Sequence, residues 1–117
     1  MIGIKTFIEV PFSFYATHRY PGAPEEVKFL REAHPHDFTC TATIEVRADD
    51  RELEFYLVRE FLNQRVAVLP RNVGESSCER LAFILLEDLQ SKYGTDLDIT
   101  VLVQEDNRYG ARKVYTH

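Results

Sequence analysis

The chain has 117 residues, of which 44% are hydrophobic and 28% charged, a balance typical of a globular domain rather than a disordered one. The formal net charge of -5 and the lack of any basic run argue against binding to nucleic acid or to an anionic membrane, since both need clustered Lys and Arg. We expect no signal peptide, no membrane span and, from Cys40 and Cys78 alone, no disulfide framework. These features predict one domain over residues 1–117, in the cytoplasm.

Two strands are predicted in the first half of the chain. Apolar, β-branched and aromatic residues alternate through residues 2–17, where Pro11 indicates an edge strand or a bulge because proline cannot donate to a ladder. Proline and glycine mark a loop at residues 21–24. Residues 37–47 alternate cleanly between an apolar face and a face of threonines and charges, which favours an antiparallel sheet with one solvated or ligand-lined side.

Two helices are predicted next. Apolar residues recur at helical spacing through residues 54–66, and again in a second helix that runs to about Tyr93. Ser76 followed three residues later by Glu79 has the form of a capping box, in which each side chain binds a free backbone N–H. Gly94 is a natural stop for this helix.

Two more strands complete the predicted order. Residues 99–104 alternate in a third strand, residues 107–110 have the composition of a turn, and residues 112–115 make a short fourth strand. The order is therefore β-β-α-α-β-β. It predicts an α+β fold with a four-stranded antiparallel sheet and two helices on one face.

Three of the four histidines gather where the first two strands meet. His34 and His36 are two residues apart, so on extended backbone both imidazoles lie on the same face. His18 ends the preceding strand, and antiparallel pairing brings it close to them. Three neutral imidazoles with an open fourth position are typical of a catalytic zinc site. A His-x-His pair alone is more often a surface feature, but the concentration of histidines in one region favours a metal site.

Four segments resemble, in order, motifs of the 6-pyruvoyltetrahydropterin synthase and 6-carboxytetrahydropterin synthase (QueD) family. Residues 12–19 resemble its F-x-F-x-A-x-H strand, and residues 34–36, His-Pro-His, resemble its H-G-H pair. Residues 76–82 resemble its P-T-x-E-N-L-A helix start, and residues 101–105 resemble its V-x-V-x-E strand. The resemblance spans nearly the whole chain and implies the tunnelling fold (T-fold), which has the same element order.

The resemblance implies that the three histidines bind Zn2+ and that Glu105 holds the guanidine-like edge of a pterin or purine, since a carboxylate accepts two parallel N–H bonds. It implies further ligand contacts from Ser76, Ser77 and Glu79, although helix capping explains these residues equally well. It also implies a homo-oligomer, a trimer or a hexamer built from trimers, in which neighbouring subunits close the edges of the sheet.

The chain departs from the family at its acid–base residues. The family has a cysteine four residues before its H-G-H pair, where this chain has Leu30, and a histidine between the helices, where this chain has none. Glu32 is the candidate catalytic substitute, although a solvated loop charge is the plainer interpretation. Asp37 is a candidate partner that orients a neighbouring imidazole.

The sequence leaves three hypotheses open. The first is a zinc-dependent carbon–oxygen lyase that acts on dihydroneopterin triphosphate or on a related pterin or purine. The second is a catalytically degenerate module that holds metal and heterocycle without turnover. The third is a protein that retains only the fold. The missing cysteine and histidine favour the second hypothesis over ordinary family chemistry, and the complete histidine set counts against the third.

Overall fold

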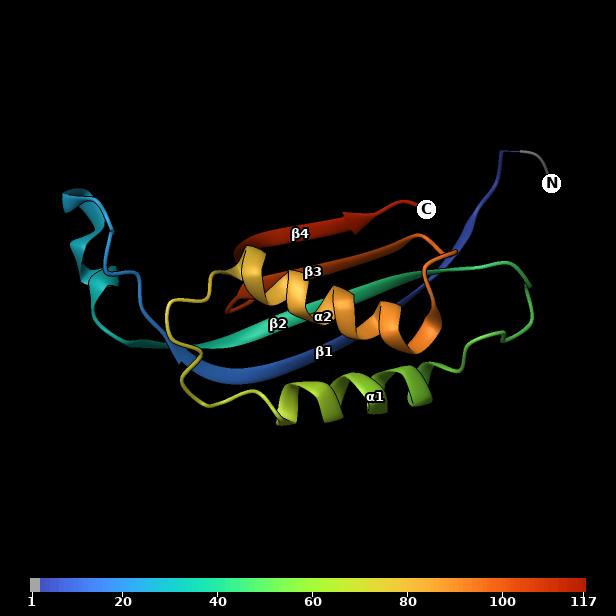
Figure 1. The fold of residues 1–117 in the computed structure, drawn as a ribbon, viewed down its shortest axis with the longest axis horizontal. Helices are drawn as coiled ribbons and strands as arrows, with labels where there is room; N and C mark the ends of the chain where they lie inside the picture. Colours follow the sequence, from blue (N-terminus) through green and yellow to red (C-terminus); the bar gives the residue numbers. More distant parts are fainter. Residues whose placement is uncertain (1–2) are drawn as a thin grey trace.

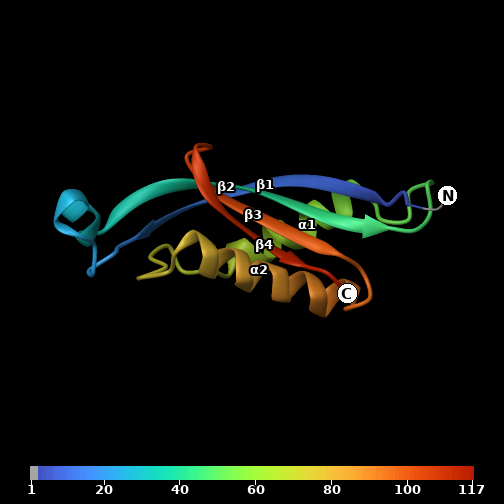
Figure 2. The same cartoon turned by 90° about the horizontal axis from the view of Figure 1, so that it is seen from above.

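An antiparallel sheet forms the body of the molecule in the computed structural model, which describes residues 3–117. Its strands, in spatial as in chain order, are β1 (Thr6–His18), β2 (His34–Val46), β3 (Ile99–Glu105) and β4 (Tyr109–Tyr115). The helices α1 (Phe55–Ala67) and α2 (Cys78–Tyr93) connect β2 to β3 and cover one face of the sheet (Figure 1, Figure 2). The predicted α+β class and element order are confirmed.

The strand β1 is an edge of the sheet, which is one of the two outcomes predicted from Pro11. Pro11 lies opposite Thr41 in a register that runs without interruption, so no bulge accompanies it. The strand begins at Thr6, and the predicted start at Ile2 lies outside the described residues. The strand β2 begins at His34, earlier than predicted, because its pairing with β1 continues to the last residue of that strand.

The hydrophobic core lies between the sheet and the two helices. Alternate residues of β2 and β3, such as Phe38, Ile44 and Val101, are completely buried. Burial of a side chain of this size stabilises the folded state by about 1.5–3 kcal/mol. The helices present apolar side chains to the same core, among them Val58 and Leu62 of α1 and Leu81, Leu85 and Leu89 of α2.

The helix α2 starts and ends with local signals. Its N-cap is Ser77 rather than the predicted Ser76, and the Ser77 hydroxyl oxygen accepts a hydrogen bond from the Arg80 N–H at 3.1 Å. Glu79 therefore does not occupy the position of a capping-box carboxylate. Gly94 ends the helix with φ 95°, a left-handed value that glycine adopts without strain. Within residues 3–117, no helix is both long enough and apolar enough to cross a membrane.

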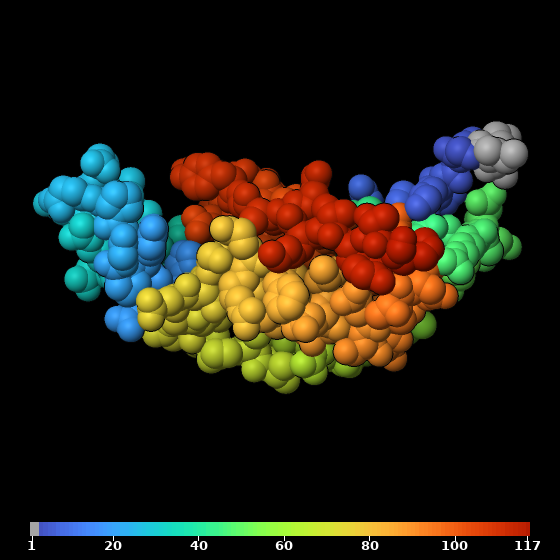
Figure 3. All heavy atoms as spheres, turned by 45° about the horizontal axis from the view of Figure 1, so that its top comes forward, coloured from blue at the N-terminus to red at the C-terminus, as the bar shows by residue number. Residues whose placement is uncertain are grey.

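The segment between β1 and β2 projects beyond the end of the sheet. It contains a 3-10 helix, η1 (Glu25–Arg31), which stands away from the body of the molecule in the space-filling view (Figure 3). The carboxyl end of β1, the start of β2 and the start of α2 meet at the base of this projection (Figure 1). The predicted histidine site lies there.

Candidate metal centre

Three imidazoles converge at the end of the β1–β2 ladder. His18 lies directly opposite His34, and His36 lies opposite Ala16. Opposed residues of an antiparallel pair share a face, as do residues two apart on one strand, so the three side chains point to the side that carries the core. Their rings stand edge to face with centroids 4.6, 5.2 and 5.1 Å apart. The structure thus brings the three predicted ligands together, with one ring nitrogen from each within 4.8 Å of the others.

Each imidazole is oriented by a hydrogen bond at its Nδ1 atom. The three partners are oxygens: the Ser76 carbonyl for His18 at 2.9 Å, the Glu32 carbonyl for His34 at 2.8 Å and the Asp106 carboxylate for His36 at 2.6 Å. Carbonyl and carboxylate oxygens only accept hydrogen bonds, so each Nδ1 carries a proton and donates it. In the neutral ring the other nitrogen, Nε2, then carries a lone pair and no proton.

Two of the Nε2 atoms have no partner among the described residues. Those of His18 and His36 are buried and have no hydrogen-bond partner among residues 3–117. A buried polar atom without a partner costs about 1–3 kcal/mol. A cation placed between the rings would satisfy these lone pairs together. Zinc fits this donor set, since it binds neutral imidazole nitrogen in tetrahedral sites and the outer hydrogen bonds orient the rings.

The Glu105 carboxylate lies beside the same nitrogens. One of its oxygens is 3.3 Å from His18 Nε2, and the other is 3.6 Å from His36 Nε2. Glu105 ends β3 and pairs with Phe38, two residues along β2 from His36, so it projects to the same face. The residue predicted to anchor a ring is therefore in direct contact with the candidate metal ligands.

The carboxylate that orients His36 belongs to Asp106, whereas the sequence suggested Asp37. Asp37 contributes its backbone N–H, which donates to Asp106 at 3.0 Å. The hydrogen bonds from His36 and from this N–H lower the pKa of Asp106 and favour its charged form. Asp106 and Asn107 adopt φ values of 53° and 59° in the turn after β3. An Asp-Asn pair suits such a hairpin turn, and this was the signal that could have indicated Asp106.

A cavity of about 530 Å³ adjoins the histidines, within the range of small-molecule sites. Its wall includes the four residues predicted to bind a ligand, which are Glu105, Ser76, Ser77 and Glu79. The Ser77 hydroxyl caps α2 and the Ser76 carbonyl holds His18, so both serines already have structural roles.

The residue at the position of the family cysteine, Leu30, and the proposed substitute, Glu32, both lie in the segment before His34. Leu30 lines the cavity and places an apolar side chain there. Glu32 is exposed, and its contact with His34 is made by the backbone carbonyl. Glu32 is not one of the described residues that line the cavity. A catalytic role for Glu32 stays a prediction.

The sequence reasoning missed Cys78 as a member of this site. Cys78 is the first residue of α2, is buried, and places its sulfur 4.0 Å from the Glu105 carboxylate. Burial, together with the negative charges of Glu105 and Glu79, raises the pKa of the Cys78 thiol to about 12. The thiol is therefore protonated at neutral pH and is a poor nucleophile. Its position in the Ser-Ser-Cys-Glu helix start was the available signal.

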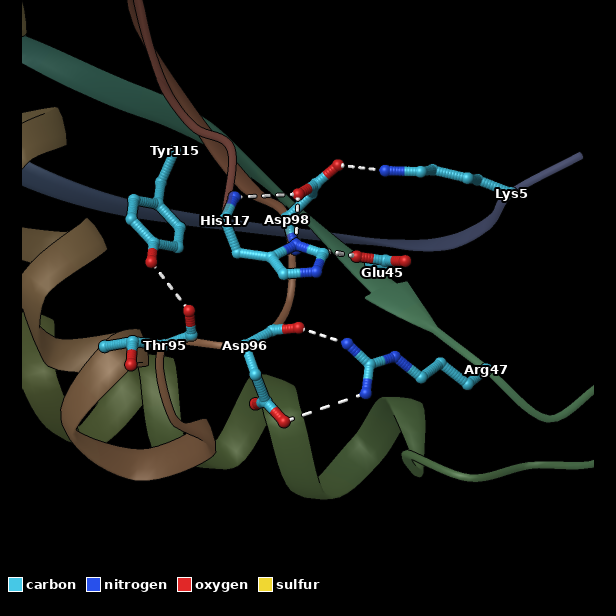
Figure 4. Close-up of polar contacts among 8 residues, drawn as sticks. All are labelled: Lys5, Glu45, Arg47, Thr95, Asp96, Asp98, Tyr115 and His117. Carbon is cyan, nitrogen blue, oxygen red and sulfur yellow. Dashed lines mark hydrogen bonds and ion pairs between the residues drawn. The ribbon is translucent and has the colours of Figure 1, made fainter. Parts of the chain in front are cut away.

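A second group of potential metal ligands lies at the opposite end of the sheet (Figure 4). The imidazole of His117 is 2.9 Å from Asp98 and 3.8 Å from Glu45. The oxygens of this group already have donors: the Asp98 N–H binds Glu45 at 2.8 Å, and Lys5 binds Asp98 at 2.8 Å. The hydrogen bonds from Lys5 and His117 hold the pKa of Asp98 well below its usual range. These contacts join the last residue of the chain to the sheet.

Comparison of the chain with known protein families and with characterised proteins finds no match. The resemblance to the tetrahydropterin synthases stays a prediction, carried by the four motifs and the order of the elements.

Proposed function

We propose that the chain binds one divalent cation, zinc, through the Nε2 atoms of His18, His34 and His36. One observation carries the proposal: each Nδ1 donates to an acceptor, one ring nitrogen of each histidine lies within 4.8 Å of the others, and within residues 3–117 the buried Nε2 atoms of His18 and His36 have no hydrogen-bond partner. Protons on these nitrogens would place positive charges side by side, whereas a single cation satisfies all three. Three imidazoles and a tetrahedral geometry favour zinc over calcium and magnesium, which prefer oxygen ligands.

The cavity beside the histidines supports a small-molecule ligand in addition to the metal. We propose a pterin or a purine-like heterocycle, in keeping with the resemblance to the tetrahydropterin synthases. The cavity volume of about 530 Å³ suits such a ring. Glu105 offers a carboxylate at the wall, and a ring edge with two parallel N–H groups is its natural partner.

Turnover would require an acid–base group in addition to the metal. Bound zinc supplies Lewis-acid chemistry and lowers the pKa of a bound water toward neutrality. A lyase that acts on dihydroneopterin triphosphate also needs a group that moves protons at the substrate carbons. In this cavity Leu30 stands where the family has its cysteine, and the Cys78 thiol has a pKa of about 12. These two observations favour the alternative function, a module that holds metal and heterocycle without turnover.

We also propose a homo-oligomer, a trimer or a hexamer, in the cytoplasm. The sheet is open, with β1 and β4 as its two edges, and an unpaired edge is a template for pairing with another chain. Both cysteines are free and buried, which suits a reducing compartment. Light scattering on the purified protein tests the assembly, and a monomer at working concentrations would contradict it.

Metal analysis and zinc titration test the central claim. We expect one zinc per chain in the wild type and none in the His34→Ala variant, with His117→Ala as the matched control that retains it. Unchanged zinc content in His34→Ala would remove the site. Incubation of the zinc-loaded protein with dihydroneopterin triphosphate then separates the functions. Released product identifies the lyase, and a stoichiometric complex without product identifies the binding module. If neither is observed, metal binding is the only function that remains.

A further inference from the structure

The position of Glu105 relative to the histidines matches a ligand of the same ion. In a tetrahedral zinc site with bonds of 2.0–2.2 Å, two ligand atoms lie about 3.3–3.6 Å apart. The Glu105 oxygens lie 3.3 Å from His18 Nε2 and 3.6 Å from His36 Nε2. Each separation, taken alone, is that of two ligands that share one ion, with one carboxylate oxygen beside His18 and the other beside His36.

The geometry of these contacts argues against the simpler explanation that Glu105 accepts hydrogen bonds from the rings. His18 Nε2 and His36 Nε2 have no hydrogen-bond partner within residues 3–117, even though the carboxylate is close. At 3.3 Å the Glu105 oxygen is near enough to His18 Nε2 for a hydrogen bond, so it lies off the axis along which this nitrogen would donate. The 3.6 Å separation from His36 Nε2 is too long for a hydrogen bond. Both features are expected when an ion, rather than the oxygen, lies on the axis of the nitrogen.

The charges lead to the same assignment. The Nδ1 partners make each neutral ring present a lone pair at Nε2, and Glu105 presents a carboxylate to the same space. Lone pairs and a negative charge repel one another unless a cation lies between them. The side chain of His18 is only 10% exposed, so water does not relieve this repulsion well.

No other carboxylate of the described residues is placed in this way. Asp106 binds the opposite nitrogen of His36, and Glu79 lies at the exposed wall of the cavity. The Cys78 thiol faces Glu105 itself, with its sulfur 4.0 Å from a carboxylate oxygen.

We propose that Glu105 is the fourth ligand of the metal, so that the ligand-free centre is a closed site of three histidines and one carboxylate. The assignment rests on the proposed metal binding by the histidines and adds a ligand to it. Sites with four protein ligands are typically structural, whereas catalytic sites keep a position for water or substrate. A heterocycle that donates two N–H groups to the Glu105 carboxylate must first displace this carboxylate from the metal. Ligand binding would then open the fourth position.

Cobalt(II) in place of zinc tests this assignment, because its visible spectrum reports the ligand set directly. The variants are Glu105→Gln, which removes the charge from the proposed ligand, and Glu79→Gln, which makes the same change elsewhere on the cavity wall. We expect the wild type and Glu79→Gln to share one spectrum that thiocyanate does not change, since no position is open. For Glu105→Gln we expect an altered spectrum, a response to thiocyanate, and cobalt affinity lower by at least about 10-fold, the loss seen even for outer partners of a metal ligand.

Two results would overturn the assignment while the three-histidine site stands. One is a Glu105→Gln protein with the spectrum and affinity of the wild type. The other is a wild type that binds thiocyanate as readily as the variant. A wild type that binds no cobalt and no zinc would instead overturn the proposed function itself. If Glu105→Gln fails to fold by circular dichroism, Glu105→Asp is judged by the same criteria, and the thiocyanate titration of the wild type decides independently.

Discussion

The two ends of the sheet each carry a cluster of potential metal ligands, and the clusters differ in what their atoms already bind. At one end, the Nδ1 atoms of His18, His34 and His36 are hydrogen bonded, and within residues 3–117 the Nε2 atoms of His18 and His36 have no hydrogen-bond partner. At the other end, Asp98 and His117 bind each other, and Lys5 adds its own positive charge (Figure 4). The second cluster therefore already contains a cationic side chain, that of Lys5.

This difference shows that residue types alone do not make a metal site. Both clusters hold three side chains of kinds that bind metals, at comparable separations. A metal gains more free energy from lone pairs that have no donor, because it need not displace existing hydrogen bonds. Within the described residues the Nε2 lone pairs of His18 and His36 are free, because the acceptors at Nδ1 set the tautomers. In the Asp98 cluster, a metal would have to displace the hydrogen bonds from His117 and Lys5.

The largest expected effect is on thermal stability in the presence of zinc. A ligand at 100 times its dissociation constant stabilises the native state by about 2.7 kcal/mol. For a domain of this size that corresponds to a rise in Tm of about 10 °C. Differential scanning fluorimetry should show this rise for the wild type and for His117→Ala, and should show none for His34→Ala. A zinc-dependent rise that vanishes in His117→Ala would exchange the roles assigned to the two clusters.

A smaller effect is expected from the carboxylate behind His36. Asp106→Asn keeps an acceptor in a left-handed position that asparagine tolerates, but removes the charge that makes the imidazole a stronger ligand. We expect zinc affinity to fall by about 10-fold, the lower end of the range for such partners. Competition with a chromophoric chelator measures this.

Asp98→Asn is the matched control for that measurement and should leave zinc affinity unchanged. An equal loss in both variants would point to a general effect of surface charge rather than to orientation of His36.

The smallest effect is expected on the pH dependence of folding. Contacts with Lys5 and His117 lower the pKa of Asp98 below its ordinary value of 3.8. A carboxyl whose pKa is lower in the folded state stabilises it above the unfolded pKa, and this stabilisation disappears as the pH falls through the folded pKa. Asp98→Asn should therefore lower the urea midpoint at neutral pH, and the difference from the wild type should shrink below pH 3.8. A difference that is constant with pH would contradict a role for the Asp98 charge.

Much of the fold could be predicted because its signals are local. The clean alternation after Asp37 marks β2, helical spacing marks α1 and α2, and Gly94 ends α2 at the predicted residue. The cap of α2 was misplaced by one residue, since two adjacent serines offer the same hydroxyl chemistry and only the backbone geometry distinguishes Ser77 from Ser76. The start of β2 was placed too late because its first residues are ordered by pairing with β1 rather than by their own alternation.

By itself the sequence determined which side chains could hold a metal and that His34 and His36 share a face, because the shared face depends only on extended backbone between neighbours. Only the tertiary structure decided which oxygens accept hydrogen bonds from the Nδ1 atoms and which carboxylate lies beside the Nε2 atoms. Ser76 and Asp106 are 58 and 70 residues from the histidines they orient, and Glu105 reaches them through the β2–β3 register. Contacts of this kind have no periodicity along the chain. They arise when the folded core sets the register of the strands and the place of α2.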